Sequence, residues 1–233
     1  MFAAVNADQR SGFARFRNSL AYDAVTRFPL VLWFAICAYA MGHRLYADAS
    51  TAAVVDARLV LDMVARASGI GFVLIVILAL SIRRPAIARS AGILPRLVAF
   101  GGTFSITALA LFEPVPHSTG IALASLILMF SGYAFACYSV VHLGRSLSMM
   151  AEARKLVMSG PYGFVRHPLY AAEAIASIGL LLQYLSLPAL ALWVVHIGLQ
   201  VARIGYEERI LRQIFPEYEN YGRRVPRLIP WVH

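Results

Sequence analysis

Six long apolar segments constrain this 233-residue chain more than any other feature of its sequence. They cover residues 28–47, 67–82, 94–112, 120–143, 169–185 and 188–206. Several approach the ~20 residues that a helix needs to cross a bilayer. The composition agrees, since 60% of the residues are hydrophobic and 14% are charged, against about 25% charged residues in soluble domains. The sequence therefore predicts an all-α integral membrane protein with about six transmembrane helices.

We expect one membrane domain over residues 1–233, because the sequence shows no internal repeat or low-complexity linker. Residues 1–27 form a basic N-terminal segment, residues 28–141 hold the first four spans, and residues 142–233 hold the richest polar motifs. Only Ser186-Leu187-Pro188 separates the last two apolar segments, which predicts a tight helical hairpin followed by a tail.

The basic residues favour one orientation of these helices in the membrane. With the N-terminus in the cytoplasm, the outer loops hold only Arg44, Arg58 and Arg66 of the 21 arginines and lysines. Cytoplasmic loops are enriched in basic residues, so we expect both termini and the tail in the cytoplasm. Contacts with anionic membrane lipids then account for the net charge of +9, without nucleic acid as a partner. The strong preference for arginine indicates a GC-rich bacterial genome and hence the bacterial inner membrane.

The N-terminal region leaves two alternatives open. Phe13, Phe16 and Leu20 recur at helical spacing among arginines, which is typical of an interfacial helix, but a disordered basic tail fits as well. Residues 28–37 resemble a signal-peptide core, although the long basic region before them favours a retained span. Cys37 and Cys137 lie in apolar stretches without metal-ligand spacing, so we predict no metal site.

The stretch GPYGFVRHPLY, residues 160–170, enters the fifth apolar segment. Gly160 and Pro161 break the chain before it, while Pro168 suits the first turn of a helix. Arg166 and His167 then stand beside free helix N–H groups, which favour an anion. The alternative is an interfacial anchor with a proline start.

A polar stripe on the sixth apolar segment adds a second cluster. His196, Gln200, Arg203 and Glu207 share one helix face, and Glu208 points about 100° away. Such a stripe normally faces the protein interior or a cavity, although Arg203 and Glu207 also suit a simple ion pair. Glu173 is a further ionisable residue inside a span, unless it only reaches the interface. The predicted hairpin brings these residues to the depth of GPYGFVRHPLY.

The tail after the sixth apolar segment is rich in aromatic and basic residues. These are Tyr218, Tyr221, Arg223, Arg224 and Arg227. They fit headgroup anchors, or a lid over a pocket.

Together these motifs resemble the isoprenylcysteine carboxyl methyltransferase family, in a wider group with phospholipid N-methyltransferases. The resemblance covers residues 142–230 and rests on GPYGFVRHPLY followed by Arg203, Glu207-Glu208, Leu211, Phe215, Tyr218, Tyr221 and Ile229-Pro230. It implies a membrane enzyme that uses S-adenosylmethionine. Two positions depart from the family pattern: Arg154 stands where many eukaryotic members have histidine, and Pro216 replaces a common glycine.

The resemblance also implies which residues form the site. The candidate cofactor-binding residues are Gly160, Pro161, Tyr162, Arg166, His167, Pro168, Tyr170, Glu207, Glu208 and Tyr221. The candidate catalytic residues are Arg203, Glu207 and Glu173.

The chemistry of the cofactor suggests a role for each of these groups. Arg166 suits the cofactor carboxylate, and Glu207 or Glu208 suits its ammonium or ribose hydroxyls. An amine acceptor needs Glu173 or Glu207 as a base, whereas a carboxylate or thiolate needs none. Arg203 suits the orientation of an anionic acceptor, and we expect a lipophilic acceptor that enters from the bilayer.

Two other functions remain open at this point. An NADPH-dependent membrane reductase of the sterol type has a similar hairpin and tail, and its cofactor's pyrophosphate also suits Arg166. A non-enzymatic transporter or lipid-binding protein would use the polar stripe as a pathway.

Overall fold

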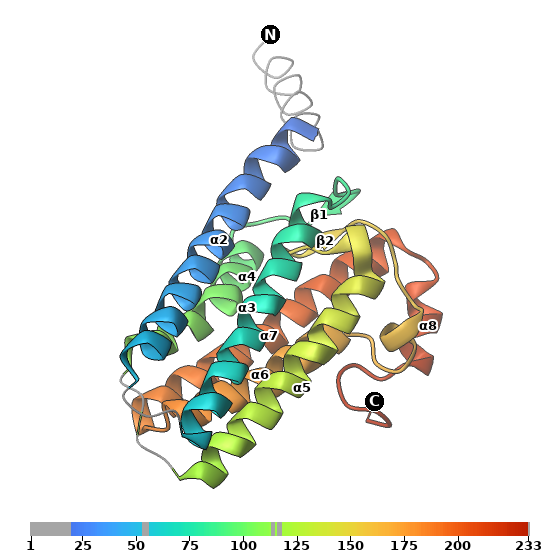
Figure 1. Ribbon diagram of the computed structural model, residues 1–233. Helices are drawn as coiled ribbons and strands as arrows, with labels where there is room; N and C mark the ends of the chain where they lie inside the picture. The colour runs from blue at the N-terminus through green and yellow to red at the C-terminus, as the bar shows by residue number, and fades with distance from the viewer. Residues whose placement is uncertain (1–19, 53–55, 113–114, 116–117, 233) are drawn as a thin grey trace.

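A computed structural model of the chain describes residues 20–52, 56–112, 115 and 118–232. Six helical segments follow one another along the described chain (Figure 1). They are α2 (Leu20–Thr51), α3 (Ala57–Ser81), α4 (Leu94–Phe104) with the 3-10 helix η1 (Ser105–Leu111), α5 (Thr119–Leu143), α6 (Pro168–Gln183) and α7 (Leu187–Ile214). Each apolar segment of the sequence is therefore helical. The predicted interfacial helix with Phe13 and Phe16 lies outside the described residues.

Polar caps make several helices longer than their apolar segments. Helix α3 begins ten residues before the predicted start, because the Asp56 side chain accepts a hydrogen bond from the Leu59 N–H at 2.7 Å. An ion pair between Arg66 and Asp48 ties the first half of α3 to the end of α2. Ser118 and Ser186 cap α5 and α7 in the same way.

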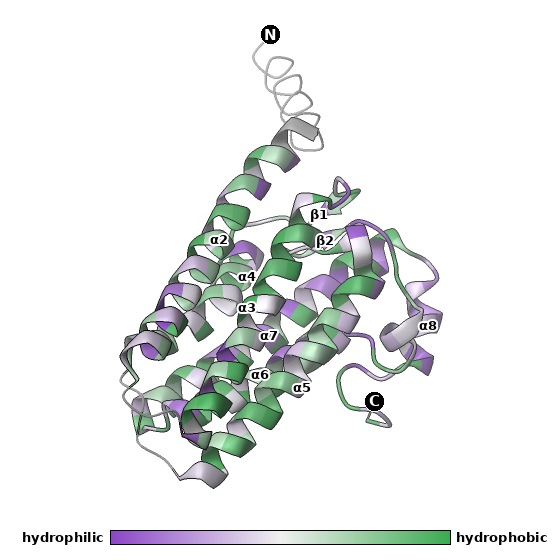
Figure 2. Ribbon diagram, viewed as in Figure 1, coloured by the Kyte–Doolittle hydropathy of each residue, from purple (hydrophilic) through white to green (hydrophobic). Residues whose placement is uncertain are grey.

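Four of the described helices are long and apolar enough to cross a membrane. They cover Asp23–Thr51, Leu59–Ser81, Thr119–Ser146 and Leu187–Ile214, and two shorter apolar helices cover Leu94–Leu109 and Pro168–Gln183. The prediction of a helical membrane protein is confirmed, and the prediction of six spans is confirmed in part. Figure 2 shows the apolar helices of the bundle and the more hydrophilic segments near α8.

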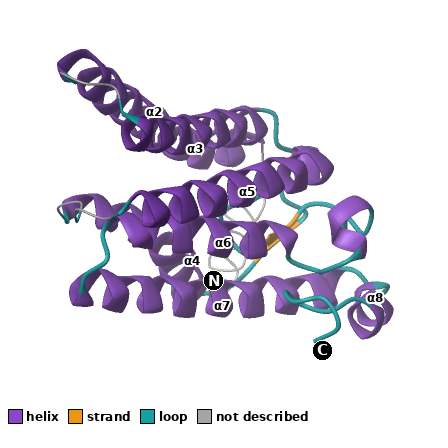
Figure 3. Ribbon diagram, turned by 60° about the horizontal axis from the view of Figure 1, so that its bottom comes forward, coloured by secondary structure: helices purple, strands orange, loops and turns teal. Residues whose placement is uncertain are grey.

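Each helix of the predicted hairpin, α6 and α7, also packs on another helix of the bundle. Helix α3 lies between α2 and α5, α5 lies against α6, and α4 lies against α7 (Figure 3). Only three residues join α6 to α7, yet α6 packs far more extensively on α5. A Cβ atom on Gly132 of α5 would lie 2.5 Å from the backbone nitrogen of Ala176 in α6. Glycine thus allows these two backbones to touch, as in other membrane helix pairs.

Two short strands and two 3-10 helices lie with α8 (Tyr218–Arg224) at one end of the bundle (Figure 1). Strand β1 (Ala88–Arg89) pairs with β2 (Glu152–Ala153) in antiparallel register, so the all-α prediction misses a small ribbon. The 3-10 helices η2 (Gly144–Ser146) and η3 (Gly160–Gly163) follow α5. This end of the bundle holds the candidate site.

Candidate functional site

A cleft opens where α3, α5, α6 and α7 meet the loop after α5 and the tail. About 950 Å³ of space lies between its atoms, and this volume includes open solvent. Eight of the candidate residues line it: Tyr162, Arg166, His167, Tyr170, Glu173, Arg203, Glu207 and Tyr221. Gly160, Pro161, Pro168 and Glu208 support its walls and do not line it.

The GPYGFVRHPLY stretch forms one wall through backbone geometry that its glycine and proline residues allow. Gly160 has φ +61°, and a Cβ atom there would lie 2.1 Å from a ring carbon of His142 in α5. Only glycine therefore fits this turn. Pro168 occupies the start of α6, as predicted. The bends leave Arg166 and His167 at the mouth of the cleft.

The C-terminal tail is tied to this wall by its own hydrogen bonds. The Arg166 N–H donates to the Pro226 carbonyl at 2.8 Å, and the Tyr221 hydroxyl donates to the Tyr162 carbonyl at 2.6 Å. Tyr218 and Tyr221 are buried and line the cleft. The tail thus forms part of the cleft wall, and the lid interpretation fits better than that of separate headgroup anchors.

The adjacent acids of α7 enter different environments. Glu207 lines the cleft and accepts a hydrogen bond from the Tyr170 hydroxyl. Glu208 faces the tail, and only 1% of its side chain is exposed. His167 lies between them, with Nε2 3.2 Å from Glu208 and Nδ1 4.0 Å from Glu207. The predicted rotation of about 100° between neighbouring residues accounts for this division.

Glu208 is the centre of a cationic cluster that joins α7, the mouth and the tail. Its carboxylate lies 3.4 Å from Arg166, 3.1 Å from Arg212 and 2.7 Å from Arg227. With His167 it therefore has four possible donors, two of which, Arg166 and His167, lie at the mouth of the cleft. The sequence placed Glu208 among the cofactor-binding residues, and its contacts favour a positioning role.

The stripe on α7 continues the polar network into the bundle. Arg203 donates to Gln200 at 2.9 Å and to the Met149 carbonyl at 3.1 Å, and its guanidinium lies 5.2 Å from the centre of the Tyr170 ring. Gln200 in turn donates to Glu173 at 2.9 Å. The sequence left a simple Arg203–Glu207 ion pair as an alternative. The structure instead shows Arg203 in a hydrogen-bond network across α6 and α7.

His196, the first residue of the predicted stripe, lies deeper between α7 and η1. Its Nδ1 is 2.9 Å from the Ser105 hydroxyl, and it is not among the residues that line the cleft. The stripe therefore divides into a part at the cleft and a part that joins two helices.

Several buried donors at the cleft have no hydrogen-bond partner within the described chain. They are Nε of Arg166, Nε of Arg203, Nε and Nη1 of Arg154, and the hydroxyl of Tyr218. Buried polar groups are normally paired, because leaving one unpaired costs free energy. The cleft is therefore suited to a ligand that is rich in hydrogen-bond acceptors.

The three tyrosines of the wall and tail remain neutral donors. Burial raises the pKa of the Tyr162 hydroxyl, and the charge of Glu207 raises it further. Burial also raises the pKa of Tyr218, with Glu208 adding to the effect, and that of Tyr221. Each hydroxyl therefore keeps its proton at neutral pH and can donate it in a hydrogen bond.

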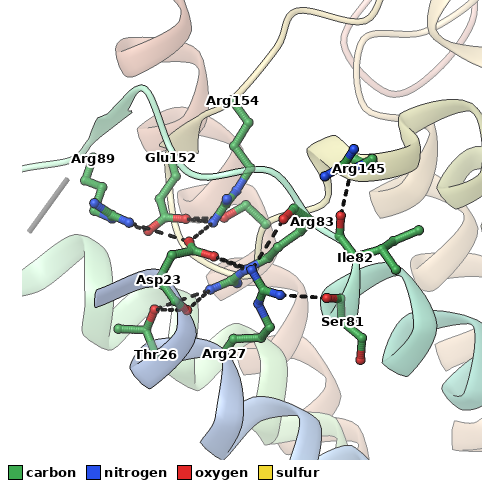
Figure 4. Close-up of polar contacts among 11 residues, drawn as sticks. Asp23, Thr26, Arg27, Ser81, Ile82, Arg83, Arg89, Arg145, Glu152 and Arg154 are labelled. Atoms are coloured by element: carbon green, nitrogen blue, oxygen red, sulfur yellow. Dashed lines mark hydrogen bonds and ion pairs between the residues drawn. The ribbon is translucent and has the colours of Figure 1, made fainter. Parts of the chain in front are cut away.

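Sequence reasoning missed an acid-centred cluster near β1 and β2. Asp23, at the start of α2, is completely buried and lies within 3.5 Å of Arg27, Arg83, Arg89 and Arg154 (Figure 4). The sequence assigned Asp23 to the basic N-terminal segment, because its long-range partners are invisible in a linear pattern. Its position four residues before Arg27 was the one available signal.

The comparisons with known proteins agree with this arrangement. The family model described as phospholipid methyltransferase matches residues 119–218, which include α5, α6 and α7. Protein-S-isoprenylcysteine O-methyltransferase B of Arabidopsis thaliana is 30% identical over 135 residues, covering 55% of this chain and 68% of that protein. A probable protein-S-isoprenylcysteine O-methyltransferase of Oryza sativa subsp. indica is 30% identical over 138 residues, or 54% and 70% of the two chains.

The chain is also similar to a bacterial protein over a shorter segment. Cobalt-zinc-cadmium resistance protein CzcN of Cupriavidus metallidurans is 40% identical over 76 residues, which cover 32% of this chain and 35% of that protein. Within the described residues, no group of three or more His, Cys, Asp or Glu side chains could hold a metal ion.

The helices and these relatives together define a membrane methyltransferase. The chain belongs to the isoprenylcysteine carboxyl methyltransferase family. The resemblance seen in the sequence is thereby confirmed.

Proposed function

We propose that the chain transfers a methyl group from S-adenosylmethionine to a lipophilic acceptor in the membrane. The observation that carries this proposal is the mixed lining of the cleft. Arg166 and Tyr218 supply buried donors on one side, while Phe72 of α3, Leu143 of α5 and Leu169 of α6 supply apolar surface. Such a cleft suits a polar cofactor beside an apolar acceptor.

The residues present fit the polar groups of the cofactor. The Arg166 guanidinium, held by Glu208, is placed to bind the carboxylate, and the Tyr218 hydroxyl can donate to another acceptor atom. Glu207 can accept from the ammonium or a ribose hydroxyl. When bound, S-adenosylmethionine supplies an electrophilic methyl group, which the acceptor takes as the carbon–sulfur bond breaks and its electrons pass to sulfur.

The remaining residues orient the reactants and keep water out. Arg203 lies against the Tyr170 ring and donates to Gln200, and Tyr170 donates to Glu207, so these side chains keep a fixed geometry. His167 is fixed between the two acids of α7. Glu173 and Glu207 are the proposed proton acceptors if the acceptor is an amine. The apolar wall excludes water and admits the acceptor from the bilayer.

We also propose that the end with the cleft, β1, β2 and α8 faces the cytoplasm of a bacterial inner membrane. The distribution of arginines supports this orientation. A cysteine in place of exposed Arg223 should resist membrane-impermeant maleimide in intact spheroplasts. If maleimide labelled this cysteine as completely in intact spheroplasts as in lysed cells, the cleft end would face the other side of the membrane.

Calorimetric titration of the detergent-purified protein with S-adenosylhomocysteine tests the cofactor. We expect saturable binding, weakened at least about 10-fold by Arg166→Ala, which corresponds to ~1.4 kcal/mol. Arg223→Ala is the matched control, because Arg223 is largely exposed and pairs only with Glu219 among the ion pairs of the described residues. We expect wild-type affinity from it.

A second ligand separates the clamp from general damage to the site. Decarboxylated S-adenosylhomocysteine lacks the group that Arg166 should bind, so Arg166→Ala should weaken it less than 3-fold. Equal losses for both ligands would refute the clamp. Binding of NADPH without S-adenosylhomocysteine would favour a reductase, and binding of neither would overturn the proposed function.

A further inference from the structure

The cluster around Asp23 holds more positive than negative charge. Four guanidinium groups, those of Arg27, Arg83, Arg89 and Arg154, surround the carboxylates of Asp23 and Glu152 (Figure 4). Among the described residues that the cluster joins, there are thus two more guanidinium groups than carboxylates. A buried excess of one charge is costly unless a counter-charge approaches.

The pKa of Arg83 agrees with this count of charges. Burial lowers the pKa of its guanidinium, and the neighbouring charge of Arg154 lowers it further. The two arginines therefore repel each other although both contact Asp23. An anion near Arg154 would relieve this repulsion.

Of the four arginines in this cluster, Arg154 lines the cleft. Its side chain is fully buried, and its Nη2 contacts Asp23 at 3.0 Å and Glu152 at 2.6 Å. Its Nε and Nη1 atoms have no hydrogen-bond partner in the part of the chain that the structure describes. Since Arg154 also lines the cleft, Nε and Nη1, on different edges of the guanidinium, can each donate a hydrogen bond to an oxygen atom of an anion.

The surroundings of Arg154 distinguish it from Arg166. Leu147 and Met149, from the loop that leads to β2, line the same cleft and pack in one apolar cluster with Phe72 and Val76 of α3. Arg83 follows the end of α3 at Ser81 by two residues, on the same side of the sequence from Val76 as this end of the helix. An amphiphile with an anionic head and an apolar chain fits this combination, whereas Arg166 lies among the tail tyrosines.

We propose that Arg154 binds a carboxylate or phosphate group of the methyl acceptor, and that Asp23 and Glu152 position its guanidinium. The assignment to the acceptor rests on the proposed function. Asp23 reaches Arg154 across 131 residues of sequence, so the start of α2 contributes to the site without lining it. Glu152 does line the cleft, and its contacts with Arg89, Arg154 and Ser148 occupy its carboxylate.

Thermal unfolding in a neutral maltoside detergent tests the subsite with octyl phosphate, octanoate and octanol. We expect both anions to raise the unfolding temperature saturably, and octanol to leave it unchanged. Arg154→Gln should raise the half-saturating anion concentration at least about 10-fold, and Arg154→Lys should raise it less. Arg84→Gln is the matched control, because Arg84 is exposed at the same end of the bundle. This variant removes the same charge as Arg154→Gln.

Asp23→Asn tests the positioning role. We expect a weaker response to octyl phosphate, restoration by Asp23→Glu, and unchanged affinity for S-adenosylhomocysteine. Equal loss of affinity for both ligands would mean that Asp23 only maintains the fold.

S-adenosylhomocysteine separates the two sources of the anion and the two proposals. Arg154→Gln should bind it within 3-fold of wild type, which also shows that the variant is folded. Arg154→Gln would instead bind S-adenosylhomocysteine more than 3-fold more weakly, but decarboxylated S-adenosylhomocysteine as tightly as wild type, if Arg154 binds the cofactor carboxylate. That result would overturn the acceptor assignment. The subsite itself would be overturned if neither anion raised the unfolding temperature. It would also be overturned if both anions raised it equally in wild type and in Arg154→Gln. Failure of the wild type to bind S-adenosylhomocysteine would refute the proposed function and leave the anion measurement decisive for Arg154.

Discussion

Replacement of Glu208 by glutamine removes the charge at the centre of the cationic cluster and nearly preserves its volume. The carboxylate is 1% exposed and contacts four donors from three segments of the chain. After the change, the amide can satisfy only part of these donors, and its own NH₂ faces positive groups. Arg166 and His167 lose the partner that orients them.

The expected loss of stability follows from the exposure of each partner. Arg212 and Arg227 are 49% and 43% exposed, so each contributes at most ~1 kcal/mol. Arg166 and His167 are 11% and 5% exposed, and loss of one member of a buried pair costs ~3–5 kcal/mol. Because solvent screens part of the cluster, we expect about 3 kcal/mol. For a chain of this size that corresponds to a fall of roughly 6–12 °C in unfolding temperature.

Intrinsic fluorescence during thermal unfolding in detergent measures this change. Glu219→Gln is the matched control, because Glu219 is 59% exposed and its pair with Arg223 spans 3.5 Å on one helix. We expect that control to lie within ~1 °C of wild type, since exposed pairs contribute little. If Glu208→Gln falls no further than the control, the cluster does not stabilise this end of the bundle and the reasoning fails.

Two further variants test local features of the site. Gly160→Ala should lower the unfolding temperature and abolish S-adenosylhomocysteine binding, because its Cβ atom would collide with His142 and its φ is positive. Gly198→Ala, with open space around its Cβ, is the control, and equal effects would contradict the collision. Tyr218→Phe should bind S-adenosylhomocysteine ~5- to 30-fold more weakly by calorimetry, with stability unchanged or raised, because its buried hydroxyl has no partner among the described residues. Unchanged affinity would remove this hydroxyl from the ligand site.

Much of the fold was predictable, because hydropathy acts along continuous segments. All six apolar segments are helices, and the positions of Pro168 and Ser186 at helix starts follow from local rules. The extension of α3 to Ala57 was missed, since Arg58, Asp62 and Arg66 interrupt the apolar run of its first turns. The ribbon of two-residue strands was missed because such strands are too short to show an alternating pattern.

Helix partners were less predictable than the helices themselves. The short connection predicted a hairpin of α6 and α7 but not the extensive contact of α6 with α5, which depends on which backbones can approach. Gly132 and Gly179 provide such contacts between α5 and α6. Small residues within apolar segments were therefore the better signal of packing.

The site was predictable where its residues lie close in sequence or on one helix face. Glu207 and Tyr170 meet as the stripe and the motif suggested, whereas Asp23 and Arg154 meet through the tertiary fold alone. The division between Glu207 and Glu208 followed from helical rotation, but the arginine partners of Glu208 come from the tail and the mouth. Long-range pairing of charges has no period in the sequence, and only the folded chain reveals it.

The two acid-centred clusters have the same electrostatic design. Each surrounds buried carboxylate with a larger number of cations, and in each an arginine with available N–H groups, Arg166 or Arg154, faces the cleft. The acids hold these arginines in place, and within the described residues each cluster has fewer carboxylates than cations. An anionic ligand would complete the charge balance, so binding and stability should be linked: a ligand at 100 times its Kd stabilises the folded protein by ~2.7 kcal/mol. Ligands at the two arginines would thus act on one end of the bundle, where α2, the loop after α5 and the tail meet.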